Sequence, residues 1–168
     1  VEEVRASGIV SNTSCCHAFD QCADGMISGD GAGFLLLKRY EDAVRDGDHI
    51  YGCILSSAMN GNGARSGNPT APSAEAEAEV VRRAWETADL TSDDITEIEA
   101  HGTGTLVGDP IEAESIQRCM TGNHREHPLY VSALKSNVGH LGNIAGFAAL
   151  VKAVSYTHLR AHETSLHL

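Results

Sequence analysis

Basic residues are scarce in this sequence. Its 168 residues hold 12 lysines and arginines against 23 aspartates and glutamates, for a net charge of −11, and the basic residues form no stripe. Binding to nucleic acid or to an anionic membrane depends on such a stripe, so neither is expected as a partner. No apolar run approaches the ~20 residues that span a bilayer, and the first residues do not resemble an export signal. We therefore expect a cytoplasmic protein.

Cysteines are also few, and they lack the spacing of a disulfide framework. The odd total of five argues for reduced thiols. The run Cys15-Cys16-His17, with Cys22 nearby, suggests a nucleophile beside its base or a metal site. Zinc sites usually show paired Cys-x-x-Cys or His spacings, and adjacent loop residues rarely point at one another. We interpret these thiols as structural and predict no metal site.

Two polar turns stand out because each carries a histidine and lies between an apolar run and a helix. The first runs from Glu99 to Thr105 and contains His101, and the second runs from Lys135 to His140. If the preceding strands are parallel neighbours, both imidazoles lie at the same edge of one sheet. This arrangement would form a reactive pocket.

The first turn has a well-marked helix after it. Asp109 is suited to cap this helix, Pro110 to its first position, and Glu112 to reach back in a capping box. The hydroxyls of Thr103 and Thr105 can hydrogen-bond to a ligand.

The rest of the chain alternates apolar runs with helical patterns, which predicts an α/β layered sheet covered by helices. Helices are predicted over Tyr40–Asp46 and from the Ser73 cap to Ala88, and strands over Phe34–Leu37 and Ile50–Ser57. In the second helix, Val80, Val81, Ala84, Trp85 and Ala88 should be buried, while Glu75, Glu77 and Glu79 face water. The glycines of Gly29–Gly33 precede a strand, so we interpret them as a tight buried turn rather than a nucleotide-binding loop.

Several motifs in order closely resemble the ketosynthase (β-ketoacyl synthase) domain of modular polyketide synthases and related fatty-acid synthases. The resemblance covers Phe19 to Val154. It rests on Phe19-Asp20, Ala23-Asp24-Gly25, Gly29-Asp30-Gly31, Asn60-Gly61-Asn62-Gly63, Thr70-Ala71-Pro72, Glu99 to Thr105, Gly108 to Glu112 and Lys135 to His140. It implies a thiolase-like layered α/β fold, here incomplete, with the end of the first half and most of the second.

The resemblance also implies an activity, decarboxylative Claisen condensation of an enzyme-bound acyl group with malonyl-acyl carrier protein. By that pattern His101 and His140 are the catalytic histidines, and Lys135 is the catalytic-site lysine. Thr103 and Thr105 resemble the pair that binds the phosphopantetheine arm. No directly bound cofactor is expected, because substrates travel on the carrier's phosphopantetheine. The expected partners are the acyl carrier protein and a second copy of the full-length parent.

The chain departs from the family in three places. The family's nucleophilic cysteine lies in a Thr-Ala-Cys-Ser type elbow upstream of the Phe-Asp motif, so Cys15 and Cys16 do not correspond to it and these residues alone should be inactive. Gly142 stands where the family usually has glutamate, which affects the hydrogen bonds around Lys135. The match stops at Val154, so we predict a partial ketosynthase domain over 1–154 and a non-native tail over 155–168, whose histidines are no metal cluster.

Two other hypotheses remain open from the sequence. A ketosynthase-like subunit without condensing activity would keep these motifs and carry another residue at the elbow. A histidine-dependent metal hydrolase is the third, although the ligand spacings do not favour it.

Overall fold

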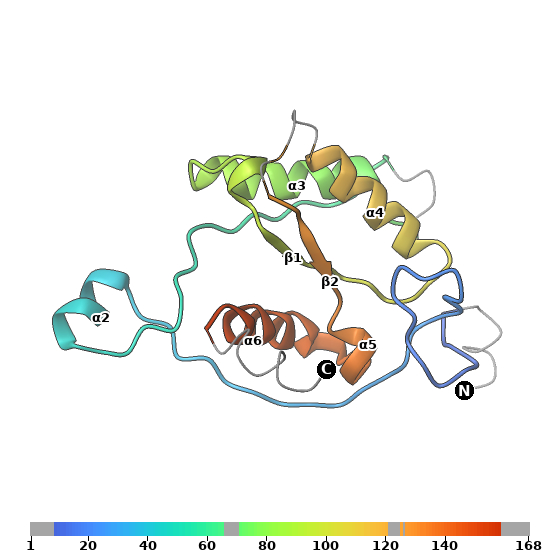
Figure 1. The fold of residues 1–168 in the computed structure, drawn as a ribbon, viewed down its shortest axis with the longest axis horizontal. Coiled ribbons are helices and arrows are strands. Elements are labelled where there is room, and N and C mark those ends of the chain that lie inside the picture. The colour runs from blue at the N-terminus through green and yellow to red at the C-terminus, as the bar shows by residue number, and fades with distance from the viewer. Residues whose placement is uncertain (1–8, 66–70, 121–124, 126, 159–168) are drawn as a thin grey trace.

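The computed structural model describes residues 9–65, 71–120, 125 and 127–158, which form helices layered on a small sheet (Figure 1). The elements, in order, are α2 (Tyr40–Asp46), α3 (Ala74–Thr87), η1 (Ser92–Asp94), β1 (Glu97–Glu99), α4 (Gly108–Cys119), β2 (Tyr130–Ser132), α5 (Lys135–Val138), η2 (Gly142–Ile144) and α6 (Ala145–His158). Among these residues, no helix is long and apolar enough to cross a membrane.

Strands β1 and β2 are parallel neighbours, as required for both histidine-bearing turns to lie at the same edge of one sheet. Glu97 pairs with Tyr130, Ile98 with Val131 and Glu99 with Ser132. The ladder extends at both ends, since Tyr130 N donates to Thr96 O at 2.9 Å and Ala100 N to Ser132 O at 2.8 Å. Because parallel strands leave a sheet at the same edge, the His101 and Lys135 turns start side by side.

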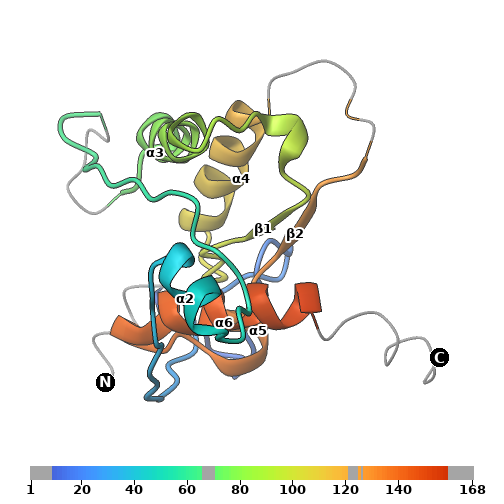
Figure 2. The same ribbon diagram turned by 90° about the vertical axis from the view of Figure 1, so that its left-hand side faces the viewer.

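Helices cover both faces of this sheet. Helices α3 and α4 pack together on one face, and α5 and α6 lie on the other (Figures 1 and 2). The Ser73 hydroxyl caps α3, accepting a hydrogen bond from Ala76 N at 3.3 Å, as predicted. The helix buries small residues, Ala76 and Ala78, whereas the predicted stripe of Val80, Val81, Ala84, Trp85 and Ala88 is only half-buried. The stripe prediction was wrong because four of its five members line a cavity instead of a filled core.

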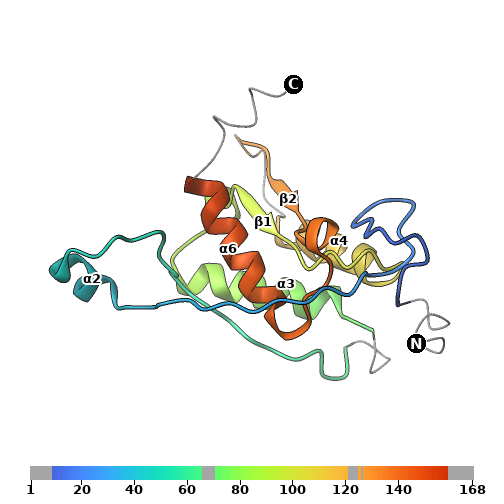
Figure 3. The same ribbon diagram turned by 90° about the horizontal axis from the view of Figure 1, so that it is seen from below.

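The predicted strands at Phe34–Leu37 and Ile50–Ser57 are extended chain without a strand partner in the described part of the protein. Phe34 is 99% and Leu36 97% exposed. An apolar run indicates burial, but a strand needs a neighbouring backbone for its N–H and C=O groups, and β1 and β2 pair with each other. Both segments flank α2, which ends at Gly47 as predicted and lies away from the sheet (Figure 3).

The glycines of 29–33 form a close crossing rather than a buried turn. The segment is extended and mostly exposed, and it runs beside α5 and α6. Two single parallel bridges join neighbouring segments here, Val10 to Met26 and Ser28 to His140. Gly29 N donates to His140 O at 3.0 Å, so this crossing fixes the backbone of the second histidine.

Helix α6 runs on to His158, past the predicted domain end at Val154. Residues 159–168 lie outside the described residues, so the boundary between 154 and 155 stays a prediction.

Replacing Gly29 with alanine should destabilise the protein, because its Cβ would collide with the backbone carbonyl oxygen of Val138. A backbone atom cannot move aside cheaply, so we expect the free energy of unfolding to fall by about 1–3 kcal/mol. Denaturant titration measures this loss. Gly61→Ala is the control, since nothing lies within 4 Å of its added Cβ; equal losses in the two variants would contradict the close crossing.

Candidate active site

Two carboxylates of α4 hold the His101 turn by its backbone. Glu112 accepts hydrogen bonds from His101 N at 2.5 Å and from Gly102 N at 2.8 Å. Buried Asp109 accepts from Gly104 N at 3.1 Å and from Phe19 N at 2.7 Å. The capping roles predicted for Asp109 and Glu112 were therefore wrong, because α4 begins at Gly108, two residues before the predicted start at Pro110, and turns both side chains toward the unpaired amides of the loop. The Thr105 hydroxyl serves the helix start instead, accepting from Gly108 N at 3.1 Å.

Two glycines let this turn approach its neighbours closely. Gly102 and Gly104 have φ values of +43° and +73°, which side chains rarely adopt. A Cβ on Gly102 would lie 2.5 Å from the Ala133 Cβ, and one on Gly104 would lie 2.9 Å from Gly25 O. The turn therefore packs directly on the exit of β2 and on the N-terminal segment.

Lys135 links the two turns. It is buried, with 7% of its surface exposed, and its Nζ donates to His101 O at 2.6 Å. The same Nζ lies 3.4 Å from His101 Nδ1. Because an ammonium group has only donors, Nδ1 is the acceptor and the His101 ring carries its proton on Nε2.

His140 lies beside His101, with ring centroids 5.5 Å apart and ring planes at 87°. Gly142 N donates to His140 Nδ1 at 3.0 Å, so this ring also carries its proton on Nε2. Gly142 has φ +58° at this contact. The structure thus brings together the three predicted residues His101, Lys135 and His140.

Burial and positive charge keep both imidazoles neutral near pH 7. Partial desolvation, and then the Lys135 ammonium, lower the pKa of His101 below its ordinary value. The same two causes in the same order lower the pKa of His140. Burial also lowers the pKa of Lys135, against the opposing effect of Glu112 and Glu99. The site therefore offers two neutral N–H donors beside a buried lysine.

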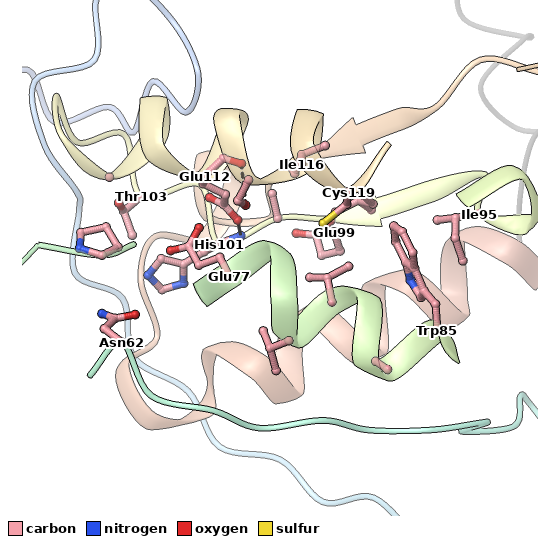
Figure 4. A pocket seen from close by; sticks show the side chains of 18 of the residues that line it. Asn62, Glu77, Trp85, Ile95, Glu99, His101, Thr103, Glu112, Ile116 and Cys119 are labelled. Carbon is pink, nitrogen blue, oxygen red and sulfur yellow. Dashed lines mark hydrogen bonds between the residues drawn. The ribbon is translucent and has the colours of Figure 1, made fainter. Parts of the chain in front are cut away.

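The two predicted threonines lie next to one another, with hydroxyl oxygens 3.0 Å apart. Thr103 is buried and lines a cavity of about 860 Å³, whereas Thr105 is engaged at the start of α4. The cavity lies between α3, β1 and α4, with His101, Glu77 and Asn62 toward one end and Trp85 toward the other (Figure 4).

Glu77, predicted to face water, lines this cavity instead. Its Oε2 is buried and has no hydrogen-bond partner in the described structure. Desolvation raises the pKa of its carboxyl, partly offset by a hydrogen bond from Ser115. Glu77 is next to the buried Ala76 and lies close to Ser115 and Glu112 of α4. The helical period of α3 alone therefore placed it wrongly on the side that faces water.

Cys16 is a buried thiol beside the site, not an activated one. Its Sγ lies 3.5 Å from Thr103 O, as donor to that carbonyl. Desolvation, and then the Asp109 carboxylate, raise the pKa of this thiol despite Lys135. Burial supports the structural interpretation of Cys16, whereas Cys15 and Cys22 are exposed. Within the described ranges, no three potential ligand residues gather to hold a metal ion.

Two family models match this chain. Residues 51–168 match the β-ketoacyl synthase C-terminal domain, and residues 1–43 match the β-ketoacyl synthase N-terminal domain. The chain belongs to the β-ketoacyl synthase family. This ketosynthase assignment confirms the family resemblance seen in the sequence, and members of this family are acyl-transferring condensing enzymes.

Among curated relatives, the ketosynthase chain is 44% identical to highly reducing polyketide synthase 19 of Pyricularia oryzae, over 87% of the chain and 6% of that protein. It is also 44% identical to the methylphloroacetophenone synthase of Cladonia uncialis, over 91% of the chain and 6% of that protein. The chain therefore spans a small part of its relatives.

A solved structure shows the fold. The oxazolomycin ketosynthase domain OzmH KS7 of Streptomyces albus superposes with a TM-score of 0.85 at 33% identity, over 93% of the chain and 28% of that domain. The predicted thiolase-like α/β fold, present in part, is confirmed.

Removing the Glu112 carboxylate should loosen the His101 turn. In Glu112→Ala, the amides of His101 and Gly102 lose their acceptor, and we expect the free energy of unfolding to fall by about 1–3 kcal/mol. Denaturant titration gives this value. Glu114→Ala is the matched control on the same helix, because its exposed pair with Arg118 at 2.6 Å contributes about 1 kcal/mol at most. Similar losses in both variants would contradict the anchoring role.

The charge of Lys135 should be measurable at His101. Removing that charge in Lys135→Met favours the protonated ring, so we expect the pKa of His101 to rise toward its ordinary value of 6.5. An NMR titration of labelled histidines follows this pKa. Lys38→Met, which removes a surface lysine paired with Asp46 and Asp48, is the control and should leave it unchanged. A fall or no change in Lys135→Met would refute the electrostatic contact.

Proposed function

We propose that the protein carrying this chain is a polyketide ketosynthase that performs decarboxylative Claisen condensation between a cysteine-bound acyl group and malonyl-acyl carrier protein. The observation that supports this most is the pair of imidazoles 5.5 Å apart, whose hydrogen bonds at Nδ1 assign the proton of each ring to Nε2. Two such donors suit a thioester oxygen on which negative charge develops.

The reaction proceeds in two steps. Loss of carbon dioxide from the malonyl thioester breaks a carbon–carbon bond and leaves the electron pair as an enolate. The Nε2–H groups of His101 and His140 stabilise the enolate oxygen. The enolate carbon then attacks the acyl thioester, forms the new carbon–carbon bond and expels the cysteine thiolate.

Lys135 acts on His101 rather than on the substrate. Its ammonium donates a hydrogen bond to His101 Nδ1 and thereby fixes the proton of the ring on Nε2. It also lowers the pKa of that ring, so the imidazole stays a neutral donor. A neutral donor does not hold the enolate as tightly as a cation would, which leaves the enolate carbon reactive.

The acyl-bearing cysteine is assigned to neither Cys15 nor Cys16. Cys16 is buried with a raised pKa, so its thiolate fraction is small. We infer that condensation needs a cysteine supplied by the parent protein and that these residues alone do not condense. Thr103 and Thr105 are the proposed contacts for the phosphopantetheine arm of the carrier, and the parent is proposed to act as a homodimer in the cytoplasm.

Each histidine should be required for decarboxylation of malonyl-acyl carrier protein by the parent protein. Loss of one oxyanion donor typically lowers kcat by about 10²–10³, and we expect this in His101→Ala and in His140→Ala. Release of carbon dioxide is the measurement. His49→Ala is the control, because His49 lies against Tyr51, with ring centroids 4.4 Å apart, away from the site. If the wild-type parent protein releases no carbon dioxide, the hypothesis of a ketosynthase-like subunit without condensing activity is favoured instead.

A further inference from the structure

A partly buried charge pair lies behind the site. Lys152 of α6 donates from Nζ to Glu99 Oε2 at 2.6 Å and to Ser132 Oγ at 2.9 Å. The Ser132 hydroxyl in turn donates to Glu99 Oε2 at 2.7 Å. The side chains of Lys152 and Glu99 are 20% and 7% exposed. This network is less exposed to water than the surface ion pairs of α2 and α4.

The other oxygen of Glu99 reaches the second turn. Glu99 Oε1 accepts from Leu134 N at 2.5 Å, directly before Lys135. Glu99 itself ends β1, two residues before His101. One carboxylate therefore joins the exits of both strands, and Lys152 ties that carboxylate to α6.

A buried carboxylate needs a partner to stay ionised and in place. Lys152 is the single Lys, Arg, Asp or Glu among the residues of α6, in an otherwise apolar sequence. Removing one member of a buried pair leaves the other charge uncompensated, whereas removing both is often tolerated. This difference makes the pair testable.

We propose that Glu99 and Lys152 are positioning residues that hold Lys135 against His101. The inference rests on the proposed function, because it assigns the pair a part in the decarboxylation of the malonyl thioester. Neither residue touches the reacting atoms. Both act by fixing the separation between the two turns, and thus the 3.4 Å contact between Lys135 Nζ and His101 Nδ1.

The same pair sets the charge balance around Lys135. The carboxylates of Glu112 and Asp109 on α4, that of Glu99 on β1, and Cys16 of the N-terminal segment act on the ammonium to raise its pKa, against burial. His101 contacts the Lys135 ammonium directly, and the charge of Lys135 also acts on His140. Removing the Glu99 charge should lower the pKa of Lys135. Removing the Lys152 charge should raise it, because Glu99 is then no longer neutralised.

The experiment uses the full-length parent protein and measures carbon dioxide release from malonyl-acyl carrier protein between pH 5 and 10. The variants are Glu99→Gln, Lys152→Met, Lys152→Arg and the double variant Glu99→Gln/Lys152→Met, with Lys38→Met as the control. Wild-type turnover tests the proposed function by itself, and the variants are compared only with that wild-type rate.

We expect Lys152→Met to lower kcat at least tenfold, Lys152→Arg to retain most of it, and the double variant to regain part of the loss. The alkaline limb of the pH profile should move to lower pH in Glu99→Gln and to higher pH in Lys152→Met. If Lys152→Met does not fold, the double variant and Glu99→Gln still test the proposal. A wild-type kcat and pH profile in Glu99→Gln, or limbs that move in the same direction in both single variants, would overturn the proposal.

Discussion

The site depends on the satisfaction of backbone amides in a glycine-containing turn. A turn with left-handed residues at Gly102 and Gly104 leaves N–H groups that no strand or helix can pair. Glu112 and Asp109 accept these hydrogen bonds from the adjacent helix. Because the amide of His101 is held by α4, its carbonyl is left facing Lys135, which donates to it at 2.6 Å. The position of the first histidine thus follows from charged acceptors on a neighbouring element, which are stronger than neutral ones.

The second histidine is placed by different means. Its backbone crosses the Gly29 segment, and its ring accepts a hydrogen bond from Gly142 N. Parallel pairing of β1 and β2 then brings the two rings to one edge. Lys135 lies between the two anchoring systems, which explains how one buried lysine can affect both imidazoles.

Local sequence chemistry predicted much of this arrangement. The Ser73 cap and the Gly47 stop depend on near neighbours, and the structure has them at the expected places. The two parallel strands are also present, although the predicted turn from Lys135 to His140 begins with the short helix α5. The choice of His101, Lys135 and His140 came from the family resemblance and from turn composition. Their proximity is now observed.

Features that depend on distant partners were not predictable in the same way. Phe34–Leu37 has the composition of a buried strand, but composition does not state which backbone will pair with it. Glu112 fits a capping box, and its actual acceptor role became visible only once the helix start was known. A buried partner for Lys152 could have been predicted from the sequence, since an isolated charge in an apolar helix needs one.

The contacts of the site span very different distances along the chain, and this has a consequence for folding. Glu112 lies 11 residues from His101, whereas Lys135 lies 34 residues from it and Lys152 lies 53 residues from Glu99. Short loops close at a lower entropic cost, so the His101 turn and α4 can assemble as a local unit early. The lysine contacts close longer loops and are expected to form later, when β2 and α6 dock. Partial unfolding from the α6 side would therefore release the lysines while the first histidine keeps its native turn.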